Sequence, residues 1–225
     1  MLFFFFALVY GGYCYIFVFT ETRSGPLNSG AIATNVALFS IFALHHSVFA
    51  RDAIRNSITR IVGTLERSFY VWVASFLFIA VCALWRPVAG LAWYVEQASI
   101  SSLMRVAQLA GVGLTLWSAW LIDIAKLSGV TQVRDSRAPS PDTSEPEFTR
   151  RGPYGWVRHP IYSGWFLMVF SEPVMTMTRF AFACISSLYL VLAIPFEERS
   201  LRRVSKGAYD QYTRDVRWKI VPGVF

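Results

Sequence analysis

Charge is scarce in this sequence: only 16% of its 225 residues are Asp, Glu, Lys or Arg, whereas 55% are hydrophobic. So few charged side chains are unusual for a soluble domain, and the composition indicates an integral membrane protein. The net charge of +7 does not indicate a nucleic-acid partner, because the basic residues fall between apolar segments. We therefore expect membrane lipid as the surrounding medium, and a single domain over residues 1–225.

Other common signals are also missing. The three cysteines, Cys14, Cys82 and Cys184, lie inside apolar runs and give neither a disulfide framework nor metal-ligand spacing. No G-x-G-x-x-G sequence follows a strand, so a Rossmann-type nucleotide site is not supported. We expect buried cysteines and no metal.

Apolar stretches predict an all-α membrane protein with about five transmembrane helices. The predicted spans cover residues 2–20, 31–50, 69–85, 102–125 and 161–196. Glu172 and Pro173 interrupt the last stretch, which predicts a C-terminal helix hairpin with arms at 161–171 and 179–196.

A charged segment, 197–218, follows the hairpin. Its apolar residues recur at spacings of three or four, which predicts a cytoplasmic amphipathic helix. The stripe consists of Leu201, Val204, Ala208, Tyr212 and Val216.

The basic residues predict the orientation. If the N-terminus is cytoplasmic, 17 of the 21 Lys and Arg residues lie on the cytoplasmic side. This asymmetry favours a multi-pass membrane protein with both termini in the cytoplasm.

The segment 151–164, RGPYGWVRHPIYSG, combines basic residues with two prolines that restrict the backbone and glycines that permit close approach. It predicts a rigid, donor-rich segment at the membrane surface; a basic loop touching lipid headgroups is the alternative. Glu197 and Glu198 follow the last apolar arm. Carboxylates there are costly unless paired, so we expect at least one to face arginines.

His45, His46 and Ser47 end the second span. They lack a third metal ligand. They are either interfacial polar residues bonded to neighbouring helices or residues that orient or deprotonate a nucleophile. Glu66 and Arg67 are expected on the same surface.

The combined pattern resembles the isoprenylcysteine carboxyl methyltransferase family, whose members use S-adenosylmethionine. The pattern lies within 149–222 and has four parts in chain order. The motif G-P-Y-x-x-V-R-H-P-x-Y-x-G comes first, a hydrophobic hairpin follows, and the motifs E-E-x-x-L and G-x-x-Y-x-x-Y come last. The N-terminal part resembles a bacterial branch of the superfamily, the methanethiol S-methyltransferase and NnrU-like proteins, which implies a bacterial plasma membrane. The residues that carry this second resemblance are Leu44–Arg51, Glu66–Tyr70, Trp85–Pro87 and Pro173–Thr178.

The resemblance implies a site for S-adenosylmethionine within residues 147–217. Its implied cofactor contacts are Tyr154, His159, Pro160, Ile161, Tyr162 and Glu197, with Glu147, Phe148 and Thr149 contributing. The candidate catalytic residues are His46, Arg158 and His159, and the candidate substrate residues are His45, His46, Ser47, Glu66 and Arg67.

The acceptor is expected to be a small thiol or another lipophilic nucleophile. Isoprenylcysteine enzymes carry a substrate-binding arginine where this chain has Ala193, which disfavours a prenylcysteine carboxylate. Three alternatives stay open: carboxyl O-methylation, an NADPH-dependent sterol reductase of a related membrane fold, and a non-catalytic NnrU-like component of nitrogen-oxide metabolism.

Overall fold

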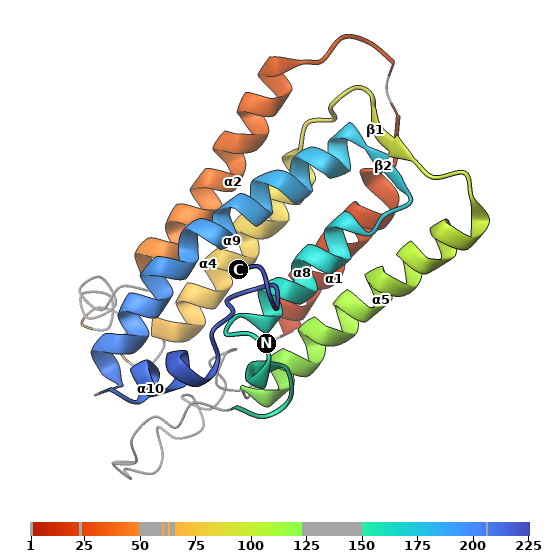
Figure 1. Cartoon of the computed structure of the whole chain (residues 1–225). Helices are drawn as coiled ribbons and strands as arrows, with labels where there is room; N and C mark the ends of the chain where they lie inside the picture. The colour runs from red at the N-terminus through yellow and green to blue at the C-terminus, as the bar shows by residue number, and fades with distance from the viewer. Residues whose placement is uncertain are drawn as a thin grey trace. The chain divides into compact units, whose positions relative to one another are not determined.

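The computed structural model describes residues 2–22, 24–49, 60, 63, 66–122, 150–205 and 207–225 (Figure 1). Most of these residues are helical, as the sequence predicts. The helices are α1 (Leu2–Tyr13), the π-helix η1 (Cys14–Val18), α2 (Ser29–Phe49), α4 (Glu66–Leu84), α5 (Ala98–Leu121), the 3-10 helix η3 (Gly152–Gly155), α8 (Pro160–Phe170), α9 (Met177–Val204) and α10 (Ala208–Asp215).

Two of the described helices, α5 and the Met177–Arg203 part of α9, are long and apolar enough to cross a membrane. Three shorter apolar helices cover Leu2–Val18, Ser68–Leu84 and Pro160–Phe170. On α5, Leu103, Leu109 and Trp120 are 68%, 70% and 69% exposed. Large apolar side chains presented in this way along one helix are suited to contact with lipid. The number of spans stays a prediction.

The chain divides into two compact units. Of the described residues, unit 1 comprises those up to Tyr94 together with Val174–Ser186, and unit 2 comprises 95–122, 150–173, 187–205 and 207–225. The candidate cofactor residues that the structure describes all belong to unit 2.

Unit 1 contains two strands that the all-α prediction does not include. β1 (Leu91–Tyr94) pairs antiparallel with β2 (Val174–Thr176), with an irregularity in register between Leu91 and Trp93. The prediction was wrong here because these short segments satisfy their backbone groups through each other, and aromatic residues in β1 favour a pleated surface.

An aromatic cluster forms part of the core of unit 1. The ring centroid of Phe182 lies 5.2 Å from that of Trp85 and 5.5 Å from that of Phe19. The side-chain amide of Asn35 accepts from the backbone N–H of Arg86 and donates to its carbonyl. These contacts join the residues that follow η1 and α4 to α2 and to the beginning of α9 within the unit.

In unit 2, α5 and α8 lie side by side (Figure 1). Gly111 and Gly164 stand at their closest approach, where a Cβ on Gly111 would lie 2.6 Å from the backbone nitrogen of Met168. Small residues let helix backbones approach without a hydrophobic driving force, as packing within a bilayer requires. Beside them, the Gln108 amide donates to the Met168 carbonyl and to Glu172.

The predicted amphipathic helix is interrupted. α9 ends at Val204, Gly207 has a φ of +98°, and α10 starts at the next residue. A φ in this left-handed region favours glycine, so the chain turns there instead of continuing as one helix. Leu201, Tyr209, Tyr212 and Val216 nevertheless pack into one cluster, in which Tyr209 takes the place expected for Ala208.

Candidate active site

The segment 151–164 is held in a fixed shape by its prolines and glycines, as the sequence predicts. Pro153 lies in the first turn of η3, and Pro160 begins α8 directly after His159. Gly152 has a φ of +56°, and a Cβ there would lie 2.8 Å from Trp117 of α5. The backbone therefore presents Arg158 and His159 between two defined helical turns.

The C-terminal segment of the chain lies along this part of the backbone. Trp218 and Lys219 accept hydrogen bonds at their carbonyls from the N–H groups of Arg158 (2.9 Å) and His159 (2.8 Å). The hydroxyl of Ser163 donates to the carbonyl of Ile220 at 2.5 Å. These bonds fix the direction in which the Arg158 and His159 side chains leave the backbone.

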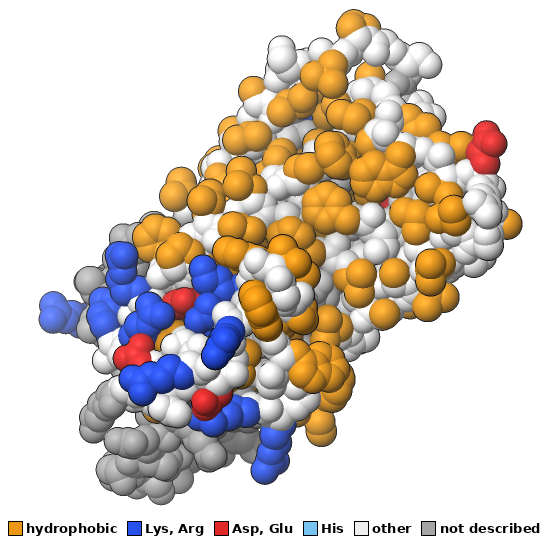
Figure 2. Space-filling view, viewed as in Figure 1, with side chains coloured by type: hydrophobic (Ala, Val, Ile, Leu, Met, Phe, Trp, Pro, Cys, Tyr) orange, Lys and Arg blue, Asp and Glu red, His pale blue; other side chains and the backbone are white. Residues whose placement is uncertain are grey.

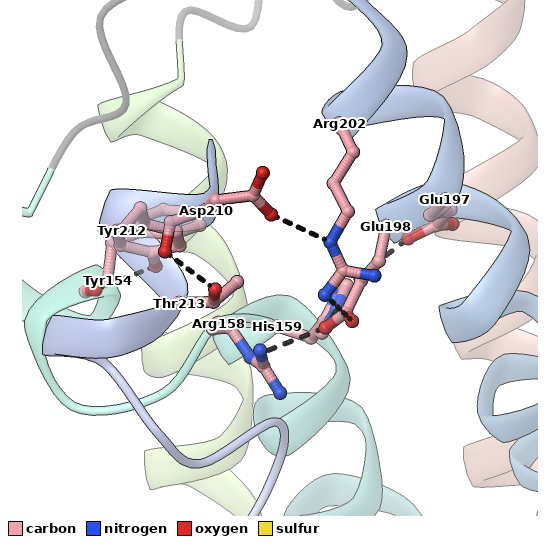
Figure 3. Close-up of polar contacts among 9 residues, drawn as sticks. All are labelled: Tyr154, Arg158, His159, Glu197, Glu198, Arg202, Asp210, Tyr212 and Thr213. Carbon is pink, nitrogen blue, oxygen red and sulfur yellow. Dashed lines mark hydrogen bonds and ion pairs between the residues drawn. The ribbon is translucent and has the colours of Figure 1, made fainter. Parts of the chain in front are cut away.

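His159 lies between two carboxylates from α9 (Figure 3). Its Nε2 atom is 3.4 Å from Glu198 Oε1, and its Nδ1 atom is 3.6 Å from Glu197 Oε2. Tyr162 stacks on the imidazole with ring centroids 5.3 Å apart and donates its hydroxyl proton to Glu197 Oε1. The structure thus brings together three of the predicted cofactor residues: His159, Tyr162 and Glu197.

The two adjacent glutamates differ sharply in environment. The Glu198 side chain is 7% exposed and lies 3.3 Å from the Nε atom of Arg158, with Arg202 at 3.8 Å. The Glu197 side chain is 42% exposed. The expectation that one carboxylate faces arginines is confirmed for Glu198, and Glu197 is the carboxylate that remains accessible.

Lys and Arg side chains gather around α10 and the C-terminal end of α9 (Figure 2). Some are paired: Arg202 bonds Asp210 at 3.1 Å, and Arg150 lies 2.6 Å from Asp215. This end of unit 2 is its polar surface, which is the environment expected for the site.

Tyr209 and Tyr212 of α10 are buried in the core of unit 2. They are 1% and 3% exposed, and the Tyr212 hydroxyl donates to the Tyr154 carbonyl at 2.8 Å. Burial raises the pKa of Tyr212 to about 12 and also raises the pKa values of Tyr154 and Tyr209. These phenols therefore stay neutral at physiological pH.

The predicted substrate residues belong to unit 1. His46 Nδ1 is 2.7 Å from the Tyr70 hydroxyl, and the His45 ring stacks on Tyr70 at 5.6 Å. Ser47 is exposed, and Glu66 begins α4. The hydrogen bond between His46 and Tyr70 of α4 agrees with the first alternative, that these are polar residues bonded to a neighbouring helix. The role in orienting or deprotonating a nucleophile stays a prediction.

Some predicted residues fall outside the description. Glu147, Phe148 and Thr149 are not among the described residues, and neither is the side chain of Arg67.

Sequence reasoning did not assign a site role to Glu198 and Arg202. Their separation by four helical positions, next to an apolar stretch, is the signal that predicts a pair. Which of the adjacent glutamates turns toward Arg158 depends on the rotation of α9 against α8, and the pattern alone does not give it.

The chain is mostly helical and apolar, and its candidate site pairs the buried carboxylate of Glu198 with the more exposed side chain of Glu197. The family model of the isoprenylcysteine carboxyl methyltransferase (ICMT) family matches residues 140–203, which include this cluster. Together these observations define a membrane methyltransferase.

Relatives extend the likeness over most of the chain. Methanethiol S-methyltransferase 1 of Bradyrhizobium diazoefficiens is 31% identical over 197 residues, covering 87% of this chain and 69% of the relative. The methanethiol S-methyltransferase of Crocosphaera subtropica is 30% identical over 230 residues (94% and 90%), and that of Mycobacterium tuberculosis is 33% identical over 187 residues (83% and 76%). No solved structure matches the chain significantly. The chain belongs to the family of these methanethiol S-methyltransferases.

Proposed function

We propose that this methyltransferase transfers a methyl group from S-adenosylmethionine to a small thiol, with methanethiol as the first candidate. The observation that carries the proposal is the identity of 30–33% to proteins named methanethiol S-methyltransferase, over 83–94% of the chain. Ala193 supports it, because a prenylcysteine carboxylate would lack the arginine that isoprenylcysteine enzymes place there.

The donor site in this proposal is the His159 cluster. We assign to it Tyr154, His159, Pro160, Ile161, Tyr162 and Glu197. Glu147, Phe148 and Thr149, which lie outside the described residues, belong to the same assignment. Tyr162 orients the carboxylate of Glu197, whose side chain is 42% exposed. An oriented, accessible carboxylate fits the ammonium group or ribose hydroxyls of S-adenosylmethionine, whose sulfonium supplies the methyl group.

Methyl transfer requires chiefly that the nucleophile, methyl carbon and sulfur be aligned. His159 and Glu197 serve by fixing one end of the donor, and Arg158 serves by holding Glu198 beside His159. A thiolate and a sulfonium lose charge as they react, so apolar surroundings favour the transition state.

The acceptor side of the proposal uses His45, His46, Ser47, Glu66 and Arg67. His46 is bonded to Tyr70, and an imidazole of this kind is a suitable acceptor for a thiol proton. The remaining elements of the proposal are a single domain of about five spans and a plasma-membrane location with cytoplasmic termini. A lipophilic acceptor would enter from the bilayer.

The test is turnover by the purified full chain in detergent. We expect dimethyl sulfide from S-adenosylmethionine and methanethiol, and no carboxyl methylation of a prenylcysteine. The ICMT match makes the second activity the alternative, and methylation of the acid without methylation of thiols would establish it.

Donor binding is tested separately by calorimetry with S-adenosylhomocysteine. His159→Ala and Glu197→Ala should each weaken binding at least about tenfold, or roughly 1.4 kcal/mol. Arg105→Ala, an exposed residue of α5, is the matched control and should leave affinity unchanged. Unchanged affinity in both site variants would remove the donor-site assignment.

A further inference from the structure

One carboxylate oxygen of Glu198 lies close to both Arg158 and His159. Oε1 lies 3.3 Å from Arg158 Nε and 3.4 Å from His159 Nε2 (Figure 3). Glu198 and His159 are 5% and 8% exposed, so water has little access to replace these contacts.

The chemistry of these atoms determines which imidazole nitrogen carries a proton. An ionised carboxylate only accepts hydrogen bonds, and Arg158 and Arg202 both favour the ionised form of Glu198. Nε2 of His159 must then donate. In the neutral imidazole, Nδ1 is left as an acceptor.

This assignment places two acceptors next to each other. Nδ1 lies 3.6 Å from Glu197 Oε2, which is too long for a hydrogen bond. The other oxygen of Glu197 already accepts from Tyr162. Two adjacent lone pairs suit a donor that carries several N–H bonds, and a primary ammonium group has three.

We propose that Glu198 is a positioning residue: it holds His159 in the Nε2–H form, so that His159 Nδ1 and Glu197 Oε2 together accept the primary ammonium group of the methyl donor. The inference rests on the proposed function for the identity of the donor. The protonation pattern of His159 can be measured without any donor.

The first experiment is nitrogen NMR of isotopically labelled histidine in the detergent-solubilised full chain. The chain has three histidines, and a His159→Asn variant identifies the signals of His159. At about pH 8, above the usual pKa of a free imidazole, we expect the Nε2–H form in the wild type and in Glu197→Gln, and a mixture of both forms in Glu198→Gln. An Nδ1–H form, or a doubly protonated ring under the same conditions, would overturn the inference.

The second experiment compares S-adenosylhomocysteine with its analogue that lacks only the amino group. We expect the wild type to prefer the amino compound by at least about tenfold, the usual scale for a charge-assisted hydrogen bond. Glu198→Gln and Glu197→Gln should each remove most of this preference and leave the affinity for the desamino analogue within about threefold. Equal weakening of both compounds by Glu198→Gln would show a merely structural role and overturn the assignment.

These outcomes separate the two proposals. If the wild type shows the Nε2–H form but binds neither compound, the donor is not S-adenosylmethionine, and the ammonium assignment falls with it. If it binds both compounds equally, the proposed function survives and the ammonium assignment is wrong. Should Glu198→Gln fail to fold, the wild-type tautomer and the Glu197→Gln preference still decide the question.

Discussion

Gly164 of α8 faces Gly111 of α5 so closely that a Cβ on either residue would lie 2.7 Å from the carbonyl oxygen of the other. The contact leaves no room for a side chain on either residue. Because α8 begins directly after His159, this contact also supports the site.

We expect Gly164→Ala to lower the free energy of unfolding by about 1–3 kcal/mol, the usual cost of overpacking a tight contact. Gly113→Ala is the matched control: it lies on α5, and a Cβ there would meet nothing within 4 Å. The control should be neutral or stabilising, because alanine has the higher helix propensity. Thermal unfolding in detergent measures both, and equal melting temperatures for the two variants would contradict the close contact.

Arg179 is a buried cation that binds backbone carbonyls. It is 5% exposed, and its guanidinium donates to Tyr15 (2.9 Å), Ile16 (2.9 Å) and Val174 (3.1 Å). Lysine lacks the planar fork that reaches several acceptors at once, so Arg179→Lys should destabilise unit 1 by about 2–4 kcal/mol.

Arg105→Lys, at an exposed position, serves as the control and should change stability by less than about 0.5 kcal/mol. A melting temperature for Arg179→Lys close to that of this control would show that the three bonds contribute little.

The hydroxyl of Tyr212 connects α10 to the segment before Arg158 through its 2.8 Å bond to the Tyr154 carbonyl. Tyr212→Phe removes this hydroxyl and leaves the Tyr154 carbonyl without its donor, so the free energy of unfolding should fall by about 0.5–1.5 kcal/mol. Tyr94→Phe, at a side chain that is 58% exposed, should have almost no effect. Thermal unfolding of the two variants compares the buried and the exposed hydroxyl directly.

The buried tyrosines also make stability depend on alkaline pH. In the unfolded chain a tyrosine ionises near pH 10, whereas burial raises the pKa of Tyr212 to about 12 and raises those of Tyr154 and Tyr209. Above pH 10 the unfolded state therefore binds fewer protons than the folded state, so stability falls as pH rises. The slope is at most about 1.4 kcal/mol per pH unit for each tyrosine, and the contribution is constant below pH 10.

Melting temperatures between neutral pH and pH ~12, read together with phenolate absorbance, test this dependence. Tyr212→Phe should show a shallower decline than the wild type. Identical slopes would indicate that Tyr212 ionises normally in the folded protein.

Much of the fold follows from local sequence. Pro160 predicts the start of α8, and the interruption at Glu172 and Pro173 separates α8 from α9. Short-range patterns succeed here because a proline acts on its immediate neighbours. They failed at β1, whose pairing with β2 depends on residues some eighty positions away, and at Gly207, where the chain turns to bury Tyr209.

By itself, the sequence determined the membrane character, the helical class and the motifs that carry the family resemblance, because composition and spacing express these properties directly. Only the tertiary structure decided that Glu198 is the buried partner of Arg158 while Glu197 keeps an accessible oxygen. Adjacent residues on a helix point in directions about 100° apart, so the packing of α9 against its neighbours selects which carboxylate is enclosed.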